Sequence, residues 1–550
     1  MILRRLMCVL AYIIIGILLF LTAQHVLTYK WFYPVDGNDP KYCFQEFYDI
    51  TDDSDIQVLF LGTSHVYCGV NPMEIYRETG ITAYDLATSA QPIETSCAIL
   101  KDALTRTKPK CVFLDVGSIF RIDVGSSYYR RVLDNMEFGP AKARLAMTFA
   151  NLYGGEHKEG AYLGAFFPMY EYHARWSELS ETDFSFDMNR NLYTKGFVFF
   201  NVLTAPAGLD VKTMNAIDEK RNSLIQDVVD GTTVDKSTNA KIFNGYEIPA
   251  DNLECLLEMK QMCDKVGAEF HLFKVPSMNY PQLFMGSWTA SKSKAIAELS
   301  DFYGIPFLDL MYDVDLSLDW ASDSIDAGAH LNAYGAEKVS AYMATYLRDA
   351  CGLKGEANHH YEEDLPTYND VDIYVRQVGI RKLGPYLESL SQMDDICVFF
   401  SAYEDMQKGL RPEDMAALNA FGLNTDFGKM MDCDAFLAIV DEGNLVYEAT
   451  SNSPLKKEGV LEDGLSYLLI SSGWYKGSKS SILLRGVEYS IKKSGLNIVV
   501  YDKKSQMVVD SLCFDTSVEG DQLAMRSRSG KYLRNYSNWR AREDYKQGIR

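Results

Sequence analysis

One serine in this sequence stands in a context that suits nucleophilic catalysis. Ser64 belongs to the run Gly62-Thr63-Ser64-His65, which directly follows the apolar stretch Ile56–Leu61 (IQVLFL). A serine that follows a buried strand on a glycine turn and begins a helix projects its hydroxyl from the end of that strand. The first N–H groups of the helix are then free to bind an oxyanion. A lone serine in this position is more often a helix N-cap, so the motif needs a second signal.

The second signal lies 266 residues later, in the run DAGAHLN that spans Asp326 to Asn332. A serine becomes nucleophilic when a nearby base accepts its proton, and a histidine base needs an acceptor that holds its tautomer. His330 and Asp326 fit these two roles. The chain order Ser64, Asp326, His330 is compatible with an α/β hydrolytic site.

The segments around these motifs alternate between short apolar runs and amphipathic stretches. This rhythm predicts a parallel sheet covered by helices on both faces, with the active site at the carboxyl ends of the strands. The predicted strands are Ile56–Leu61, Ala83–Leu86, Cys111–Val116, Glu269–Val275 and Pro306–Leu310, and the predicted helices are Glu94–Arg106, Asn252–Lys265, Ser291–Tyr303 and Ala333–Leu347.

Composition and length divide the chain up to residue 385 into a domain, an insertion within that domain and a linker. Residues 50–352 form the first globular domain, and within it the aromatic-rich stretch 118–250 is too long for a loop, so we expect a helical insertion over the active edge of the sheet. Residues 353–385 are polar and are interpreted as a linker. In it, His359 and His360 stand beside two glutamates, as a metal site would require, but a solvated linker is the favoured interpretation.

Residues 386–550 are predicted to form a second domain of α+β type. The predicted strands are Asp395–Ser401, Ala435–Val440, Ser481–Leu484, Asn497–Tyr501 and Met507–Phe514, with a helix at Pro412–Phe421 and a hairpin turn at Asp441–Asn444. The tail from Arg526 to Arg550 carries eight Lys or Arg against two acidic residues. It suits either contact with an anionic envelope polymer or lipid, or a solvated terminus.

The first 30 residues predict a membrane anchor. Arg4 and Arg5 precede 24 residues without a charged side chain, and Leu6–Ala23 is almost wholly apolar and long enough to span about 27 Å as a helix. By the positive-inside rule, the arginines stay in the cytoplasm and both domains lie outside. The alternative is a cleaved signal peptide, but the apolar run is long and Leu21-Thr22-Ala23 is a poor cleavage site.

Charge and cysteine content exclude other classes. Net charge is −21, with 75 acidic and 54 basic residues, so the chain lacks the basic footprint of a nucleic-acid-binding protein. The eleven cysteines include no C-x-x-C pair and no Cys/His cluster at ligand spacing. We therefore expect neither a structural zinc site nor a disulfide scaffold, and no cofactor.

Taken together, GTSH after the first strand, DLATSAQP after the second and DAGAHLNAYGAEK before the last helix of the domain resemble the SGNH/GDSL hydrolase superfamily. They resemble most its membrane-anchored extracytoplasmic branch, which includes the D-alanine transfer protein and the alginate acetylation proteins. The resemblance implies a flavodoxin-like three-layer fold, Ser64 as nucleophile and His330 as base, with the N–H groups of Ser64 and Ala90 as the oxyanion hole. Ala90 stands where the family has a glycine. The N–H of Ala90 suits the oxyanion hole if the φ of Ala90 stays negative.

Two positions differ from the family pattern. The aspartate commonly lies three residues before the histidine, where this chain has Ala327, and Asp326 lies four before. The Asn of the third block has no counterpart in FLDVGSIF, where Asp115 stands. Among the other histidines, His65 is not expected to be the base, His173 is expected to pack or to line an acceptor pocket, and His271 is expected in the core.

The C-terminal run RGVEYSIKKSGLNIVVYDKKSQMVVDSLCFDT (485–516) resembles the interleukin-like EMT inducer module, or GG domain. This resemblance implies glycan recognition, with a structural spacer as the alternative.

The two resemblances lead to one expected function: an extracytoplasmic serine O-acyltransferase that moves an acyl group, most simply acetyl, onto an envelope or secreted polysaccharide. The expected partners are the polysaccharide acceptor and a membrane-bound O-acyltransferase as acyl supplier. The alternatives are a carbohydrate O-acetyl esterase and a non-catalytic glycan-binding accessory protein.

Overall fold

The computed structural model describes residues 2–28, 40–120, 125–179, 184, 194–199, 241–277, 288, 290–320, 323–325, 328–518 and 524–526. The chain divides into two compact units, residues 1–199 with 205–365 (unit 1) and residues 200–204 with 366–550 (unit 2). The described part is mixed α/β and combines a parallel sheet, a mainly antiparallel sheet and an N-terminal apolar helix.

Unit 1 is built on a five-stranded parallel sheet with the strand order β2-β1-β3-β6-β7. This is a doubly wound order, in which the chain reverses its direction of winding between β1 and β3; proteins with this topology bind ligands at the carboxyl ends of the strands at that point. The strands are β1 (Val58–Gly62), β2 (Ala83–Ala87), β3 (Cys111–Asp115), β6 (Glu269–Lys274) and β7 (Phe307–Asp309). All five predicted strands are confirmed.

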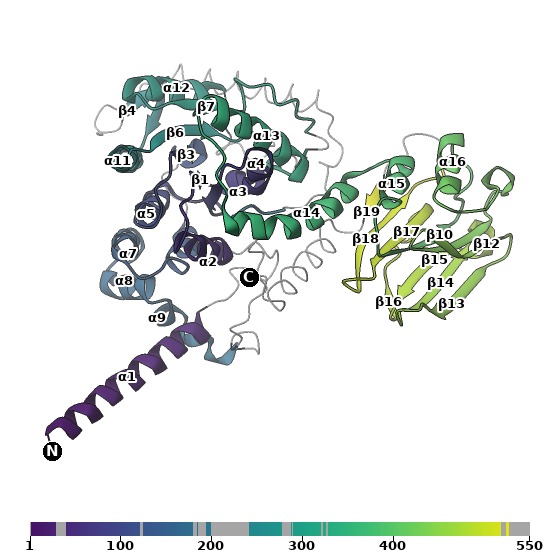
Figure 1. Cartoon of the computed structure of the whole chain (residues 1–550), viewed down its shortest axis with the longest axis horizontal. Helices are drawn as coiled ribbons and strands as arrows, with labels where there is room; N and C mark the ends of the chain where they lie inside the picture. The colour runs from purple at the N-terminus through teal and green to yellow at the C-terminus, as the bar shows by residue number, and fades with distance from the viewer. Residues whose placement is uncertain are drawn as a thin grey trace. The chain divides into compact units, whose positions relative to one another are not determined.

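Helices cover both faces of this sheet (Figure 1). Alternate strand residues such as Leu59 and Leu61 pack on one face against α5, α11 and α12, whereas Phe60 packs with Phe113 and Phe273 on the other face, which α3, α4 and α13 cover. The helices are α2 (Pro40–Thr51), α3 (Ser64–Gly69), α4 (Pro72–Thr79), α5 (Ile93–Ala103), α11 (Ala250–Val266), α12 (Ala290–Tyr303) and α13 (Ala333–Asp349). The four helices predicted here are present.

The described part of the expected insertion is helical: α6 (Ser126–Leu133), α7 (Pro140–Tyr153), α8 (Lys158–Phe166), α9 (Pro168–Tyr172) and the 3₁₀ turn η2 (His173–Ser177). Helix α7 packs on α5, and α8 and α9 continue the row away from the sheet (Figure 1). These helices extend a helical layer. Two described parts of the insertion bond to residues near Ser64: Arg131 of α6 donates to the Ser89 carbonyl at 3.4 Å, and the N–H of Val198 donates to the Tyr67 carbonyl at 2.8 Å. Most of residues 180–240 lie outside the described part, and short hairpins β4 (Lys241–Phe243) with β5 (Tyr246–Ile248) and β8 (Ser324–Ile325) with β9 (His330–Leu331) follow.

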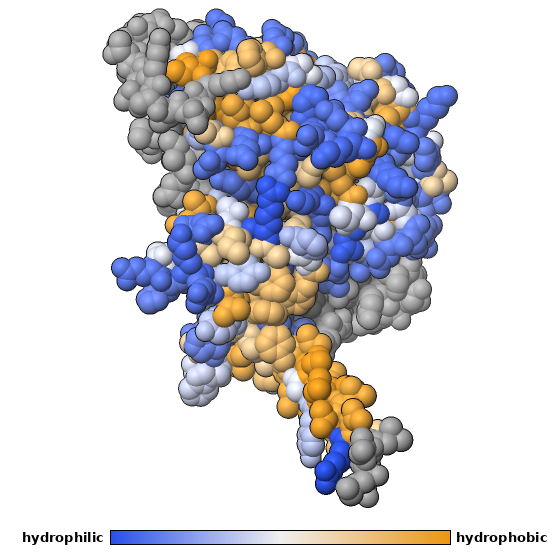
Figure 2. Space-filling view, turned by 90° about the vertical axis from the view of Figure 1, so that its left-hand side faces the viewer, coloured by the Kyte–Doolittle hydropathy of each residue, from blue (hydrophilic) through white to orange (hydrophobic). Residues whose placement is uncertain are grey.

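The N-terminal helix α1 (Ile2–Leu27) contains a 23-residue stretch, Arg5–Leu27, whose most apolar 18-residue window has a mean hydropathy of 2.8 and no buried residue. It is long and apolar enough to span a membrane, as predicted. Its C-terminal part contacts α9 and η2: the ring of Phe20 lies edge-on to Phe167 at 5.5 Å, and Arg175 donates to the carbonyl of Leu27 at 2.7 Å. Figure 2 shows that the apolar surface of α1 continues onto the adjoining surface of unit 1.

The stretch 353–385, interpreted as a linker, instead contains α14 (His359–Gly379) and the start of α15 (Leu383–Leu390). Asn358 caps α14, because its side-chain oxygen accepts from the N–H of His360 at 3.1 Å. Tyr361 is fully buried and donates to the carbonyl of Ala83 at 2.6 Å. The polar composition of this stretch concealed a helix whose buried residues include three tyrosines, Tyr361, Tyr368 and Tyr374, and two valines, Val371 and Val375.

Unit 2 contains a sheet of ten described strands, antiparallel except for one parallel pairing between β10 and β14. The predicted strands, helix and hairpin are present, and Glu442 and Gly443 take the positive φ values of a tight hairpin turn. Its elements are β10 (Ile396–Tyr403), α16 (Pro412–Ala420), η6 (Phe427–Lys429), β11 (Ala435–Asp441), β12 (Asn444–Ser451), β13 (Leu455–Val460), β14 (Ser466–Ser472), η7 (Trp474–Lys476), β15 (Lys479–Leu484), β16 (Val487–Glu488), β17 (Gly495–Asp502), β18 (Met507–Phe514) and β19 (Ala524–Arg526). Of the basic tail, only Arg526 is described, and it pairs with Asp510 at 3.0 Å.

Candidate active site

Ser64 begins α3, directly beyond the carboxyl end of the central strand β1. Gly62 makes this tight exit possible: its φ is +149°, and a Cβ there would lie 2.7 Å from the Cβ of Asp115 and 2.8 Å from Val66 Cγ2. Thr63 is the N-cap of α3. Ser64 therefore occupies the first turn of a helix, where backbone N–H groups have no intrahelical acceptor, and it is only half-buried.

His330 meets Ser64 from the other end of unit 1. It lies in β9, which pairs with β8, and two residues later the Asn332 side chain caps α13 by accepting from the N–H groups of Tyr334 and Gly335 at 3.0 and 3.2 Å. The Ser64 Oγ lies 2.8 Å from His330 Nε2. This is hydrogen-bond distance between a hydroxyl and an imidazole, the geometry in which the histidine can accept the serine proton.

Asp326, the predicted orienting acid, lies outside the described residues. The nearest described acidic residue in the sequence is Asp323. Its side chain accepts a hydrogen bond from Lys338 at 2.7 Å and another from the N–H of Asp319 at 2.7 Å. Asp323 thus fastens the loop before β9 to α13. This anchorage, together with the Asn332 cap, fixes the position of the histidine strand.

Ala90 stands in the turn between β2 and α5, next to the turn that carries Ser64. The N–H of Thr88 donates to the carbonyl of Gly62 at 3.2 Å, which ties this turn to the Ser64 turn. Ala90 takes a φ of +48°, the left-handed region that favours glycine, contrary to the expectation that its φ stays negative. The turn therefore holds the alanine in a conformation that carries an energetic cost for a residue with a Cβ.

Tyr67 is a neighbour of Ser64 that the sequence did not bring to attention. It lies one helical turn after Ser64 on α3, and its hydroxyl bonds to Ser89 Oγ at 2.8 Å. Burial raises the pKa of Tyr67, and hydrogen bonds to Ser89 and Ser64 oppose this shift. Arg131 of α6 donates to the Ser89 carbonyl at 3.4 Å. The i, i+3 spacing from Ser64 was the available signal for Tyr67; Arg131 had none.

Asp115 ends β3 beside β1, at the position where the resembling family has an asparagine. Its buried carboxylate accepts from the N–H of Gly117 at 3.1 Å and of Val275 at 3.3 Å, and lies 3.8 Å from Lys274 Nζ. A carboxylate that accepts from the backbone in this way organises the strand ends. It cannot donate a hydrogen bond to an oxyanion, as an asparagine amide can.

The other predicted histidines lie in different settings. His65 has its ring 5.2 Å from that of His330, with Nδ1 3.2 Å from Thr63 Oγ1. His173 is exposed in η2 and bonds to the Tyr170 carbonyl, so it is not a packed residue. His271 is buried, as expected. His359 and His360 approach Asp53 at 3.4 and 2.7 Å and form with it a surface group of possible metal ligands.

In comparisons with known proteins, no family model and no curated protein sequence matches this chain. The class that the fold and the site define is an α/β protein with a serine–histidine pair at the switch point of a doubly wound sheet.

Proposed function

We propose that this protein is a serine-dependent O-acyltransferase of the SGNH type, which transfers an acyl group, most simply acetyl, to a polysaccharide outside the cytoplasm. The observation that carries the proposal is the 2.8 Å contact between Ser64 Oγ and His330 Nε2. Two residues 266 positions apart meet at the sheet edge where doubly wound proteins bind ligands, in the relation that an acyl-transfer mechanism requires.

The reaction proceeds in two balanced halves. Ser64 Oγ attacks the acyl carbonyl of the donor while its proton passes to His330 Nε2; the leaving group then takes that proton, and an acyl-Ser64 ester is left. In the second half, His330 Nε2 accepts the proton of an acceptor hydroxyl while the hydroxyl oxygen attacks the ester carbonyl. The bond from the carbonyl carbon to Ser64 Oγ then breaks, His330 returns the proton to Ser64 Oγ, and the acylated acceptor leaves. The N–H groups of Ser64 and Ala90 are assigned to the developing oxyanion.

A sugar acceptor is favoured by features on both units. The apolar helix α1 suits an anchor, which would hold the site near envelope polymers. In unit 2, η7 exposes Trp474 and Tyr475, two aromatic side chains whose faces suit stacking on sugar rings. A membrane-bound O-acyltransferase as acyl supplier and the outside location of both units come from the family resemblance and the positive-inside rule.

The first test is chemical labelling of the nucleophile in the full chain in detergent. A fluorophosphonate probe should label the wild type, should not label Ser64→Ala, and should label His330→Ala at least about 10³-fold more slowly. The exposed residues Ser127 and His157 supply matched controls, Ser127→Ala and His157→Ala, which should be labelled like the wild type. Equal labelling of all variants, or of none, would favour the accessory-protein function.

The second test decides between transfer and hydrolysis. An activated acetyl ester is supplied with and without a panel of oligosaccharides, and acetylated sugar and free acetate are measured. The proposal expects acetylated sugar in the presence of the right acceptor and little acetate without it. Acetate as the only product, together with deacetylation of acetylated polymer, would establish the esterase instead.

A further inference from the structure

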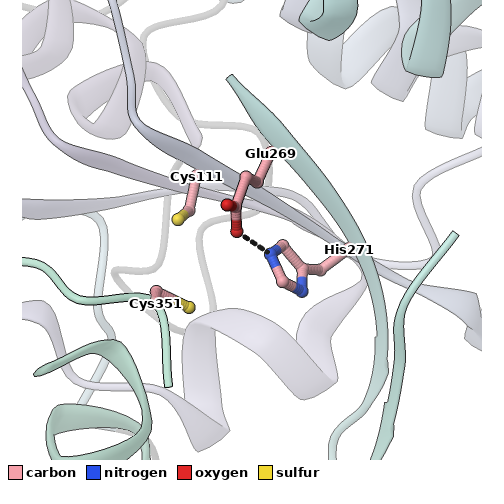
Figure 3. A group of neighbouring side chains, drawn as sticks. All are labelled: Cys111, Glu269, His271 and Cys351. Carbon is pink, nitrogen blue, oxygen red and sulfur yellow. Dashed lines mark hydrogen bonds and ion pairs between the residues drawn. The ribbon is translucent and has the colours of Figure 1, made fainter. Parts of the chain in front are cut away.

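Four side chains with sulfur, nitrogen and oxygen donors meet at the amino-terminal edge of the parallel sheet, away from the serine–histidine pair. One donor atom from each lies within 4.8 Å of every other; the residues are Cys111, Glu269, His271 and Cys351 (Figure 3). Cys111 is the first residue of β3 and Glu269 the first of β6, whereas Ser64 follows the carboxyl end of β1. The group is therefore separate from the candidate active site.

Two of these ligands are held rigidly by the sheet. Cys111 pairs with Glu269 in the parallel register of β3 and β6, and Phe113 pairs with His271 two residues further along. The ring of His271 stacks on Phe113 at 4.6 Å and lies edge-on to Tyr346 of α13 at 6.3 Å. Cys111 and His271 are both buried, so packing fixes where their donor atoms lie.

The other two ligands can adjust. Cys351 follows the end of α13, where its N–H donates to the Tyr346 carbonyl at 3.1 Å and Gly352 takes a φ of +65°. Glu269 has a side chain that is 65% exposed, and its Oε2 lies 3.3 Å from His271 Nε2. Figure 3 shows both sulfurs and the Glu269 carboxylate on the side of the ring that carries Nε2.

The chemistry of this donor set selects a cation. Two thiolates and an imidazole suit borderline-soft Zn²⁺ in a tetrahedral site, whereas Ca²⁺ and Mg²⁺ require oxygen ligands. Bond lengths of about 2.0 to 2.3 Å place tetrahedral donors roughly 3.3 to 3.8 Å apart. The donor atoms lie within 4.8 Å of one another. Side-chain rotations that move the donor atoms of Glu269 and Cys351 by about 1 Å therefore bring the group to tetrahedral separations.

We propose that Cys111, Glu269, His271 and Cys351 bind one Zn²⁺ ion in a closed structural site. Such a site joins the end of the last helix of the sheet domain to the first residues of two central strands. The binding free energy then adds to folding free energy, because the unfolded chain has no preformed site. Local sequence spacing did not reveal this group, since its members are spread over 240 positions, 111 to 351.

The test uses the full chain in detergent, purified without a histidine tag. Elemental analysis should find about one zinc per chain. Metal-free protein titrated with Co²⁺ should develop the thiolate-to-cobalt charge-transfer band and the strong visible bands of four-coordinate cobalt. The bound zinc and the cobalt bands should be lost in Cys111→Ser and in Cys351→Ser. Glu269→Gln, an exposed and conservative change, should bind Co²⁺ at least about 10-fold more weakly.

Matched controls come from a second pair of neighbouring thiols, Cys97 on α5 and Cys255 on α11, which are close enough to hydrogen-bond to each other. Cys97→Ser and Cys255→Ser should keep the wild-type zinc content and cobalt spectrum. His360→Ala, which disrupts the surface group with Asp53, should also keep them. A chelator should lower the melting temperature of the wild type and of these controls but not that of Cys351→Ser.

Three results would overturn the proposal. The first is zinc and cobalt binding that survives unchanged in both serine variants of the site. The second is loss of the signals in the His360→Ala control. The third is wild-type protein without zinc in which peptide mapping finds a disulfide between Cys111 and Cys351, since a disulfide removes both thiolates.

Discussion

Asp85 in β2 should make the stability of unit 1 fall as pH rises. Its side chain is completely buried, and neither carboxylate oxygen has a hydrogen-bond partner among the residues that the structure describes. Burial raises the pKa of Asp85 well above its ordinary value of 3.8. Its surroundings include Cys43 of α2, whose Sγ donates to the Asp85 carbonyl at 2.8 Å, and Lys195, whose carbonyl accepts from the Asp85 N–H at 3.0 Å. Within the described part of the chain, burial is the cause of the raised pKa of Asp85, and no positive charge opposes it.

The sign follows from proton linkage. Between the unfolded pKa and the raised folded pKa, the native state holds a proton that the unfolded state has lost, so unfolding becomes easier with increasing pH. The loss is about 1.4 kcal/mol for each pH unit in this window. Asp85→Asn removes the titration and keeps the shape, so its stability relative to the wild type should rise by the same amount per unit, starting just above about pH 4.

The assay is urea unfolding of the full chain in detergent, followed through the unit 1 transition at several pH values from about 4.5 to 7. Asp349→Asn is the matched control, because Asp349 is exposed and pairing with Arg348 lowers its pKa, which places its titration below this range. The control should reproduce the wild-type slope. Parallel pH profiles for the wild type and Asp85→Asn would show that Asp85 does not hold its proton in the folded state and would refute the reasoning.

Three further outcomes follow from the site and the anchor. Gly62→Ala should destabilise unit 1 by at least about 2 kcal/mol in the same urea assay, because its Cβ meets Asp115 and Val66 and its φ is +149°; a smaller loss would mean that the turn relaxes. Tyr67→Phe should cost about 1 kcal/mol and slow probe labelling of Ser64 several-fold, because it removes the hydroxyl that bonds to Ser89; unchanged labelling would make Tyr67 purely structural. A reporter fused to the C-terminus should be active only outside the cytoplasm, and its activity inside would reverse the proposed topology.

The sequence predicted the parallel sheet well because its strands are buried on both faces and are therefore continuous apolar runs, such as IQVLFL before Ser64. The sequence also paired Ser64 with His330, through the order of the two motifs and the resemblance that they carry, and the two side chains lie 2.8 Å apart in the structure. Two motifs that lie far apart in the sequence can therefore be predicted to meet in space when the strands and helices around each of them are easy to recognise.

Three other features could not be predicted from the sequence. α14 was missed because its composition is polar and many of its buried residues are polar or tyrosine, such as Tyr361, which donates a hydrogen bond to the Ala83 carbonyl. The positive φ of Ala90 is set by the turn that joins β2 to α5, and local propensity argues against it for an alanine. The cysteine group at the amino-terminal edge depends on strand register, because Cys111 meets Glu269 only when β3 and β6 pair in one alignment.

The serine–histidine pair alone cannot decide between transfer and hydrolysis, because both reactions pass through the same acyl-Ser64 ester. Ser64 and His330 are each only half-buried, so the described part of the site does not exclude water from them. Under the proposed function, selectivity must therefore come from the acceptor. A well-oriented bound hydroxyl has an effective concentration on the order of 10⁵ M, against roughly 55 M for water, and so prevails about 10³-fold or more. A bound acceptor can thus direct the ester to transfer even in a wet site, whereas an empty acceptor site leaves hydrolysis as the slow default. The dependence of free acetate on acceptor concentration measures this competition directly: acetate release should fall as acceptor saturates, and acetate release that is indifferent to acceptor would assign the site to hydrolysis.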